Sequence, residues 1–313
     1  MLFPVRQGVL CAGNIVYDTV VRPVDELRWD QSTWVDSIET HLGGNGAISS
    51  WTLGKLGVPV RLLSAIGQDP FGDQVLGLLG EVHVDTSGVV RMEAPTPCTV
   101  AVVHTNGARA ILHRPGASSE AFLELPSLDT SFGHFHLANI YAVPALRTVG
   151  VTLLERARAA GMTTSSDTGW DSQGRWIEPL APCLPYIDIL FMNEEEARKL
   201  SGTEEPEVAG RFFLSRGVRV VVVKMGAAGC LLATGEGMLR LPGFAVTVAD
   251  TTGAGDSFAG GFLAALYHGQ TLEEAARFAN AIGACSVTRL GGTAGLLGYE
   301  ETLAWIKSAV DRA

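Results

Sequence analysis

Short apolar runs alternate with segments of helical apolar spacing along most of this chain. The first run, Val9–Ala12, is followed by a glycine, and Val218–Val223 is rich in valine, as expected for a strand buried on both faces. Asn45–Leu56 has helical spacing and is followed by Gly57, a C-terminal cap signal. This alternation predicts an α/β domain with a mostly parallel sheet between helices. Further strands are expected at 60–66, 134–140, 162–167, 187–192 and 244–249, and further helices at 144–160, 194–200, 255–268, 272–289 and 300–310.

Two stretches interrupt the alternation. Tyr17–Glu39 contains β-branched runs without helical periodicity, and Thr99–His113 has the pattern of a hairpin around Asn106-Gly107, a strong tight-turn signal. We expect these stretches, at about 15–40 and 97–115, to form a small second sheet inserted into the α/β domain. No internal repeat or long linker divides the chain, so a single domain over 1–313 is predicted.

Composition and charge narrow the function. Of the 313 residues, 47% are hydrophobic and 18% are charged, which permits a large core. The net charge of −10 disfavours binding to nucleic acid. No apolar run reaches about 18 residues, so no membrane span is expected. The five cysteines form no Cys-x-x-Cys pair and lie mostly in apolar surroundings, which favours free thiols and a cytoplasmic location.

The segment Asp250–Phe262 carries the strongest chemical signal. Gly253, Ala254 and Gly255 fall where the expected strand 244–249 passes into a helix, so their backbone N–H groups can face outward. A helix N-terminus with small residues stabilises the charge of a transferring phosphoryl group. Asp256 lies in the same turn; alone it would be a capping residue, but its neighbours favour a catalytic role.

This segment resembles the C-terminal signature of the ribokinase-like (PfkB) carbohydrate kinases. The resemblance implies a three-layer sandwich with a mostly parallel central sheet and a small β-sheet lid. It also implies that Gly253-Ala254-Gly255 form an anion hole and that Asp256 is the catalytic base. Asp250 and Thr252 lie where some members bind an activating monovalent cation such as K⁺.

Other segments resemble the family in the same order along the chain. Each alone has an ordinary explanation, such as helix capping for an Asn-x-x-Glu pair, and their joint order gives them weight. By resemblance, the substrate would be held by Asn14, Asp18, Gly43, Gly44 and Asn45. The nucleotide would be bordered by Asn193, Lys224, Gly226, Gly229 and Asn280, with Glu196 reaching Mg²⁺ through water.

The chain also departs from ribokinases. Val16 and Ile48 stand where ribokinases carry asparagines that hold ribose, and Asn45 replaces a lysine. These losses disfavour ribose and suggest an apolar face in the substrate pocket. The prediction is therefore an ATP- and Mg²⁺-dependent kinase that phosphorylates a hydroxyl of a small sugar-like substrate, with a nucleoside kinase of the same family as the alternative.

Two other classes are less favoured. A dinucleotide-binding oxidoreductase would carry Gly-x-Gly-x-x-Gly after the first strand, where Cys11-Ala-Gly-Asn14 stands instead. A non-catalytic sensor with this fold would not need a base at Asp256. The inserted sheet is expected to cover the substrate as a lid, and its other face to form a homodimer contact.

Overall fold

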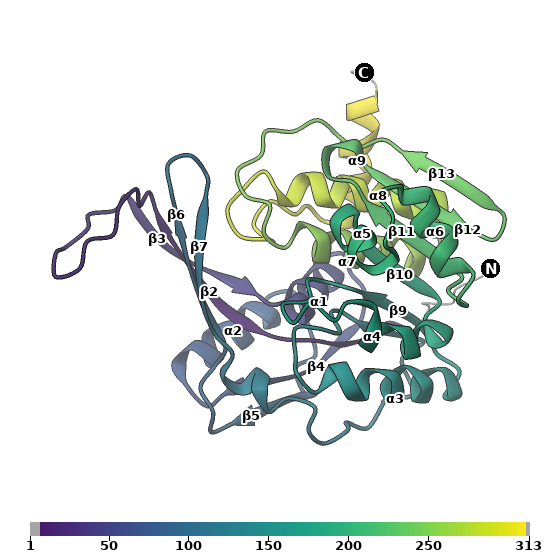
Figure 1. The fold of residues 1–313 in the computed structure, drawn as a ribbon, viewed down its shortest axis with the longest axis horizontal. Helices are drawn as coiled ribbons and strands as arrows, with labels where there is room; N and C mark the ends of the chain where they lie inside the picture. The colour runs from purple at the N-terminus through teal and green to yellow at the C-terminus, as the bar shows by residue number, and fades with distance from the viewer. Residues whose placement is uncertain (1–6, 311–313) are drawn as a thin grey trace.

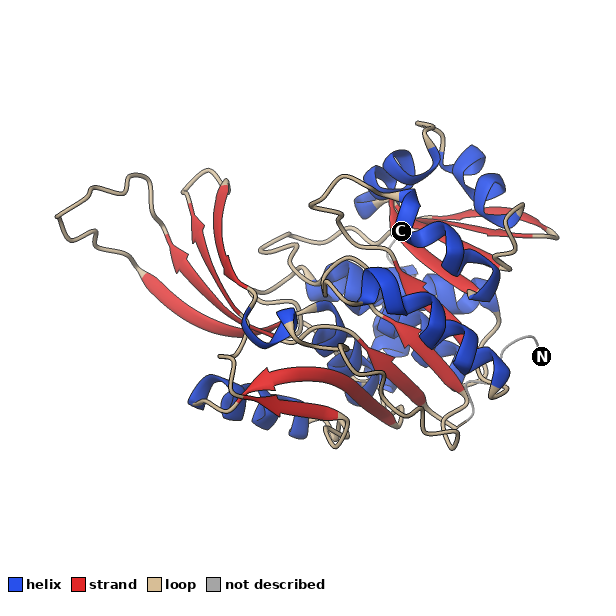
Figure 2. Ribbon diagram, turned by 60° about the horizontal axis from the view of Figure 1, so that its bottom comes forward, coloured by secondary structure: helices blue, strands red, loops and turns tan. Residues whose placement is uncertain are grey.

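The computed structural model describes residues 7–310 and has three layers, with helices on both faces of a central sheet (Figures 1 and 2). In this part of the chain the large sheet has nine strands in the order β13-β12-β11-β10-β9-β8-β1-β4-β5. All neighbours from β11 to β5 are parallel, whereas β12 and β13 are antiparallel. The strands are β1 Val9–Ala12, β4 Val60–Gly67, β5 Val89–Met92, β8 His134–Leu137, β9 Thr163–Asp167, β10 Ile189–Asn193, β11 Val220–Lys224, β12 Cys230–Thr234 and β13 Gly237–Leu241.

Helices cover the sheet in two groups that belong to two separate hydrophobic clusters. Side chains of α1, α2, α7 and α8 pack on one face, and those of α3, α5 and α6 pack on the other. The predicted α/β architecture is therefore confirmed. The helices are α1 Asn45–Lys55, α2 Pro70–Gly80, α3 Leu146–Ala159, α4 Ile177–Leu180, α5 Glu194–Ser201, α6 Pro206–Leu214, α7 Ala254–Tyr267, α8 Leu272–Ser286 and α9 Tyr299–Val310, with 3₁₀ turns at Gly116–Ser119, Ala181–Tyr186 and Gly226–Ala228.

Strands β1, β10 and β11 carry apolar residues on both faces because alternate residues enter different clusters. In β10, Phe191 packs against the α7 side, whereas Leu190 and Met192 pack against the α3 side. Phe191 is fully buried and meets the ring of Phe262 from α7 edge to face, 5.3 Å between centroids. A strand that is buried on both faces needs this continuous apolar pattern. Such contacts fix α7, and with it the turn that precedes it, against the sheet.

The interrupting stretches form a separate four-stranded sheet in the order β3-β2-β6-β7, as predicted. It projects from the body, and the loop between β2 and β3 extends furthest (Figure 1). Every residue of β7 is exposed, and Ile38, Ile111 and Leu112 leave large apolar surfaces uncovered. We call this sheet the lid. Its strands are β2 Val16–Arg22, β3 Ser37–Gly43, β6 Cys98–Val103 and β7 Arg109–Arg114.

One expected strand is wrong. Residues 244–249 form no strand and pair with no sheet, although their apolar pattern resembles one. Phe244, Val246 and Val248 instead line a cavity, and Val248 is 58% exposed. The apolar side chains therefore face a cleft, and the pattern reflects a cavity wall instead of a buried sheet.

Two further observations concern membrane spans and cysteine pairing. Within residues 7–310, no helix is long and apolar enough to cross a membrane. All five cysteines are unpaired, and four of them are buried. Burial raises the pKa of Cys11 to about 12, so this thiol stays protonated and serves as part of the core.

Candidate active site

The candidate site lies where parallel strands end. Asp167, Asn193 and Lys224 are the last residues of β9, β10 and β11, which are neighbours in the sheet. Asn14 and Asn139 follow the ends of β1 and β8, the next two strands along. Ligands of open α/β sheets bind outside the carboxyl ends of the strands, and five polar side chains gather at that edge here.

The Gly253–Gly255 turn leads into α7 at this edge. Gly253 has a φ of 70°, a left-handed conformation that glycine adopts without strain, and Ala254 is the first residue of the helix. A β-carbon at Gly255 would lie 3.0 Å from Nζ of Lys224, so the ammonium stands directly over the turn. The N-terminal amides of α7 and the Lys224 charge therefore act on the same small volume, which suits an anion.

Asp256 lies in the first turn of α7 and is connected to the substrate-side residues by a chain of amides. Asn45 Nδ2 donates to Asp256 Oδ1 at 2.7 Å, and Asn139 Nδ2 donates to Asn45 Oδ1 at 2.9 Å. The backbone N–H of Asn45 donates to Asn14 Oδ1 at 2.9 Å. Burial raises the pKa of Asp256 to about 6, although the Asn45 hydrogen bond and the Lys224 charge oppose the shift.

Lys224 is held by a carboxylate that the sequence did not single out. Its Nζ lies 2.6 Å from Asp167 Oδ2, and both side chains are nearly buried. Burial raises the pKa of Asp167 to about 7; Lys224 opposes this shift, and the charges of Glu196 and Asp256 add to it. Burial alone would lower the pKa of Lys224. The carboxylates of Asp167, Glu196 and Asp256 outweigh this effect and raise the pKa of Lys224. The ammonium therefore stays charged.

Asn193 and Glu196 form the capping box of α5. Asn193 Oδ1 accepts the Glu196 N–H, and Glu196 Oε2 accepts the Asn193 N–H, each at 2.8 Å. Thr168 Oγ1 also donates to Glu196 Oε2 at 3.0 Å. The capping explanation is thus correct, yet both side chains line the same cavity as Asp256. The capping hydrogen bonds fix the orientation in which Asn193 and Glu196 face this cavity.

This cavity has a volume of about 900 Å³ and joins the predicted nucleotide side to the base. Asn280 lines it and donates to the carbonyls of Leu241 and Pro242, both at 3.2 Å, which holds the start of the 244–249 wall. The 244–249 wall and Val287 make the part of the cavity next to Asn280 apolar. Of the predicted residues, it is lined by Asn45, Asn193, Glu196, Lys224, Gly226, Gly229, Ala254, Gly255, Asp256 and Asn280.

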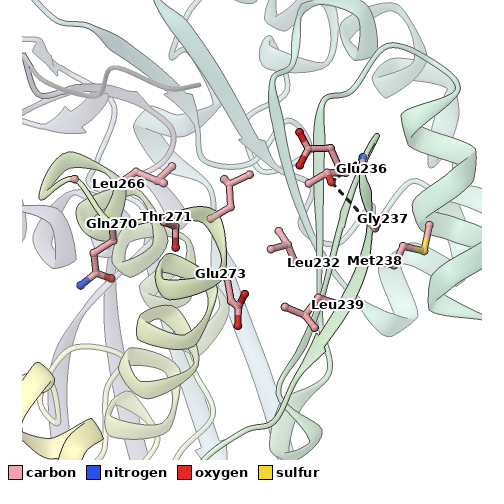
Figure 3. Close-up of a pocket in the computed structure, with 12 residues that line it drawn as sticks. Leu232, Glu236, Gly237, Met238, Leu239, Leu266, Gln270, Thr271 and Glu273 are labelled. Carbon is pink, nitrogen blue, oxygen red and sulfur yellow. Dashed lines mark hydrogen bonds between the residues drawn. The ribbon is translucent and has the colours of Figure 1, made fainter. Parts of the chain in front are cut away.

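A second cavity, of about 680 Å³, lies between the β12–β13 hairpin and the ends of α7 and α8 (Figure 3). Leu232 and Leu239 line it from the hairpin and Glu273 from the start of α8, while Glu236 lies at the turn of the hairpin (Figure 3). None of the predicted site residues lines it. The two cavities are therefore separate, and the chemistry belongs to the first.

The remaining predicted substrate residues lie beside the cavity and do not line it. Asp18 is on β2 at the base of the lid, and a β-carbon at Gly43 would collide with its carboxylate. Burial raises the pKa of Asp18 to about 6; a hydrogen bond with Thr99 opposes this and the charge of Asp250 adds to it. Gly44 contacts the backbone of Asn14 from the N-cap position of α1. Asp18 and the amide chain thus lie on the lid side of Asp256.

Asp250 and Thr252 are close together, as expected, but they contact an arginine. Arg109, at the start of β7 in the lid, donates from Nη2 to Asp250 Oδ1 at 2.9 Å and from Nη1 to Thr252 Oγ1 at 2.8 Å. Burial would raise the pKa of Asp250, but hydrogen bonds from Thr252 and Gly291 and the charge of Arg109 outweigh it and hold the pKa below its ordinary value. These residues do not fit a monovalent cation in this arrangement.

The expectation that Ile48 gives the substrate pocket an apolar face is wrong. Its side chain is 2% exposed, and a β-carbon at Gly253 would lie 2.8 Å from its Cδ1. Ile48 therefore supports the turn from beneath and adds no apolar face to the substrate pocket.

Sequence reasoning missed Asn139, Asp167 and Arg109. The first two had a signal, because each is a polar residue at or just after the end of a buried parallel strand. Arg109 had none, since its partner is 141 residues away along the chain.

Known proteins resemble this chain over almost its whole length. A family model described as "pfkB family carbohydrate kinase" matches residues 6–297. The chain belongs to the pfkB family of carbohydrate kinases. A relative named ATP-dependent ribose-1-phosphate kinase, from Halopiger xanaduensis, is 32% identical over 90% of this chain and 93% of its own length.

Solved structures agree with the fold of this pfkB-family chain. Ribokinase from Thermotoga maritima has a TM-score of 0.81 at 29% identity and covers 96% of this chain and 99% of its own. An Arabidopsis thaliana ribokinase complexed with ribose and ATP has a TM-score of 0.84 at 26% identity, over 96% and 98% of the two chains. The predicted family and fold are confirmed, and the substrate is a separate question.

The amide chain predicts how the pKa of Asp256 responds to mutation. Asn45 donates to the charged carboxylate, so Asn45→Ala should raise the pKa of Asp256 further above about 6. Carboxyl-¹³C NMR of aspartate-labelled protein would follow the titration, with the Asp256 signal assigned by its loss in Asp256→Asn. Ser49→Ala is the control, because Ser49 bonds only the Asp256 backbone carbonyl. An Asp256 pKa near 4, or one unmoved by Asn45→Ala, would contradict the arrangement.

Proposed function

We propose that this chain is an ATP-dependent kinase that phosphorylates a hydroxyl group of a small sugar or sugar-like substrate. The observation that carries the proposal is the position of Asp256 in the first turn of α7, beside the Gly253–Gly255 amides and within the reach of the Lys224 charge. A base, an anion hole and a fixed cation are the parts that phosphoryl transfer to an alcohol requires.

Asp256 accepts the hydroxyl proton in this proposal. With a pKa of about 6 it is ionised at neutral pH and still more basic than an ordinary aspartate, which suits a general base. Asn45 fixes one carboxylate oxygen through its 2.7 Å hydrogen bond and leaves the other for the substrate hydroxyl. The amide chain from Asn139 keeps Asn45 in the orientation that donates.

The nucleotide would occupy the opposite part of the cavity in this proposal. Phe244, Val246 and Asn280, which line it there, would border the adenine, and Gly226 and Gly229 would border the phosphates. Lys224 and the α7 amides take the charge of the transferring group. This placement puts the phosphoryl group between the base and the ammonium.

Mg²⁺ would neutralise charge on the ATP phosphates in this pocket. Three carboxylates, those of Asp167, Glu196 and Asp256, surround the single ammonium of Lys224, so negative charge is in excess. Within residues 7–310, no three His, Cys, Asp or Glu side chains are grouped to hold an ion directly. These residues fit an ion that is held by phosphates and by water next to Asn193 and Glu196.

The substrate lies between the cavity and the lid. Asp18 accepts hydrogen bonds from sugar hydroxyls and Asn14 and Asn45 add polar contacts, while Gly43 leaves room for the Asp18 carboxylate and Gly44 for the backbone of Asn14. Ile48 gives no support to the nucleoside alternative, because it is buried beneath Gly253. The protein acts in the cytoplasm, as its free thiols suggest.

An assay of ADP release tests the function directly. The panel should include ketohexoses, pentoses, sugar phosphates, sugar acids and adenosine. Asp256→Asn should cut turnover by roughly 10²–10⁴-fold while ATP binding, measured by calorimetry, persists, because only the base is lost. Turnover close to that of the wild type in Asp256→Asn would remove the base assignment, and no turnover with any sugar-like substrate would contradict the function.

Asp18 should determine substrate affinity. Asp18→Ala removes an acceptor whose hydrogen bonds, as charged groups, contribute roughly 1.5–3 kcal/mol each. Calorimetry with the best substrate of the panel should show this loss, whereas the affinity for ATP should be unchanged. An unaltered substrate affinity would place Asp18 outside the substrate site.

The exposed face of the lid is proposed to form a homodimer contact. Ile38 and Leu112 are 65% and 66% exposed and lie on the face of the sheet opposite Asp18, and exposed apolar side chains that share one face of a sheet mark subunit contacts. Light scattering at micromolar concentration should give twice the chain mass, and Leu112→Asp should give a monomer. Leu123→Asp, at an exposed apolar residue outside the lid, is the control. A wild-type monomer would contradict the contact.

A further inference from the structure

The lid and the anion-hole turn are joined by one buried carboxylate. The side chain of Asp250 is 6% exposed, and that of Arg109, which reaches it from the lid, is 33% exposed. The two guanidinium nitrogens bond Asp250 Oδ1 and Thr252 Oγ1 at 2.9 and 2.8 Å. Arg109 thus makes a bidentate contact between β7 and the 250–252 segment, which no strand pairing connects.

Oδ1 of Asp250 has no free acceptor site in this arrangement. Oδ1 accepts from Arg109, from the Thr252 N–H at 2.9 Å and from Thr252 Oγ1 at 2.8 Å. Oδ2 accepts the Gly291 N–H at 3.1 Å. Each carboxylate oxygen offers about two acceptor positions, so Oδ1 is fully used and Oδ2 keeps one. A K⁺ ion at Oδ1, the oxygen that Arg109 bonds, would have to displace one of these donors.

The same donors hold the turn in place. Thr252 immediately precedes Gly253, and a β-carbon at Gly292 would lie 2.9 Å from the Thr252 carbonyl. The Ala254 N–H in turn donates to the Thr251 carbonyl. Asp250 therefore connects the two loops that shape the turn, and its position affects where the α7 amides point.

A positive charge stabilises the ionised carboxylate of Asp250, in addition to the hydrogen bonds from Thr252 and Gly291. A buried carboxylate without a cation is strongly unfavourable, and the Asp250 charge also raises the pKa of nearby Asp18. Arg109 supplies that charge from β7. Because β7 belongs to the lid, the charge arrives only when the lid lies against the body.

We propose that the Arg109 guanidinium takes the place of a monovalent cation at Asp250, so that the lid itself orients the Gly253–Gly255 turn and the enzyme needs no K⁺. Arg109 is a positioning residue in this inference, which rests on the proposed kinase function. Closure of the lid then assembles the anion hole in the same movement that covers the substrate.

The test compares phosphorylation rates in chloride salts of K⁺, Na⁺ and tetramethylammonium at one ionic strength. The wild-type rate should be the same in all three. Arg109→Ala should lose about 10- to 100-fold in kcat in tetramethylammonium, the change that loss of one hydrogen bond to a charged group produces. K⁺ or free guanidinium should restore much of the loss, which a merely structural role would not allow.

A readout without catalysis accompanies the rates. K⁺ should raise the melting temperature of Arg109→Ala above its value in tetramethylammonium and leave that of the wild type unchanged, because only the variant has a vacant cation site. Arg22→Ala is the matched control, since Arg22 pairs with Glu39 inside the lid. Arg22→Ala should show neither the loss in kcat nor the rise in melting temperature with K⁺. Arg109→Met keeps most of the apolar length of the side chain without its charge, if the alanine variant folds poorly.

The results that would overturn the role of Arg109 differ from the result that would contradict the kinase function. Stimulation of the wild type by K⁺ overturns the inference and leaves the kinase function standing. A kcat of Arg109→Ala equal to that of the wild type in tetramethylammonium, or a loss that neither K⁺ nor guanidinium restores, also overturns it. Absence of phosphorylation in every salt by the wild type contradicts the proposed function itself.

Discussion

Three buried carboxylates meet one buried ammonium at the carboxyl edge of the sheet, and this balance of charge governs the site. Asp167 holds Lys224 at 2.6 Å, while Glu196 and Asp256 act on it from the sides. Burying this many charges is costly, and removal of one partner from a buried pair is strongly destabilising. The carboxylates in turn keep Lys224 charged, so its charge and theirs depend on one another.

The same burial gives Asp256 its chemistry. An exposed aspartate is a weak base, but desolvation raises the pKa of Asp256 to about 6, while Lys224 and Asn45 prevent a larger shift. The position of the carboxylate in the first turn of α7 depends on Phe262 and Phe258, whose rings pack against Phe191 of the central sheet. Core packing and base strength are thus parts of one arrangement.

The lid contributes to the site in two ways. Its base carries Asp18, and its far hairpin returns Arg109 to Asp250. This ion pair joins the far end of the lid to the body, whereas the base of the lid contacts α1 and α2. In the proposed function the lid is therefore both a cover for the substrate and a source of charge for the turn beneath it.

Much of this could be predicted from the sequence, because the signals are local. Apolar periodicity predicted the sheet and its helices, the Asn106-Gly107 turn predicted the lid hairpin, and the Asp250–Phe262 segment predicted the turn and its carboxylate. These features depend on neighbours within a few residues. The same local reasoning wrongly made 244–249 a strand, since an apolar run does not show whether it faces a core or a cleft.

Only the tertiary structure decided which distant side chains meet. Lys224 and Asp167 are 57 residues apart, Asn45 and Asp256 are 211 apart, and Arg109 and Asp250 are 141 apart. Ile48 likewise supports Gly253 across more than half the chain. Such contacts depend on strand order and on how the lid rests on the body, which no local pattern encodes. The sequence by itself determined the fold, the family and the position of the Gly253–Gly255 turn at the start of a helix. Long-range packing decided the burial and charge around them, because both depend on residues that the chain brings together only when it folds.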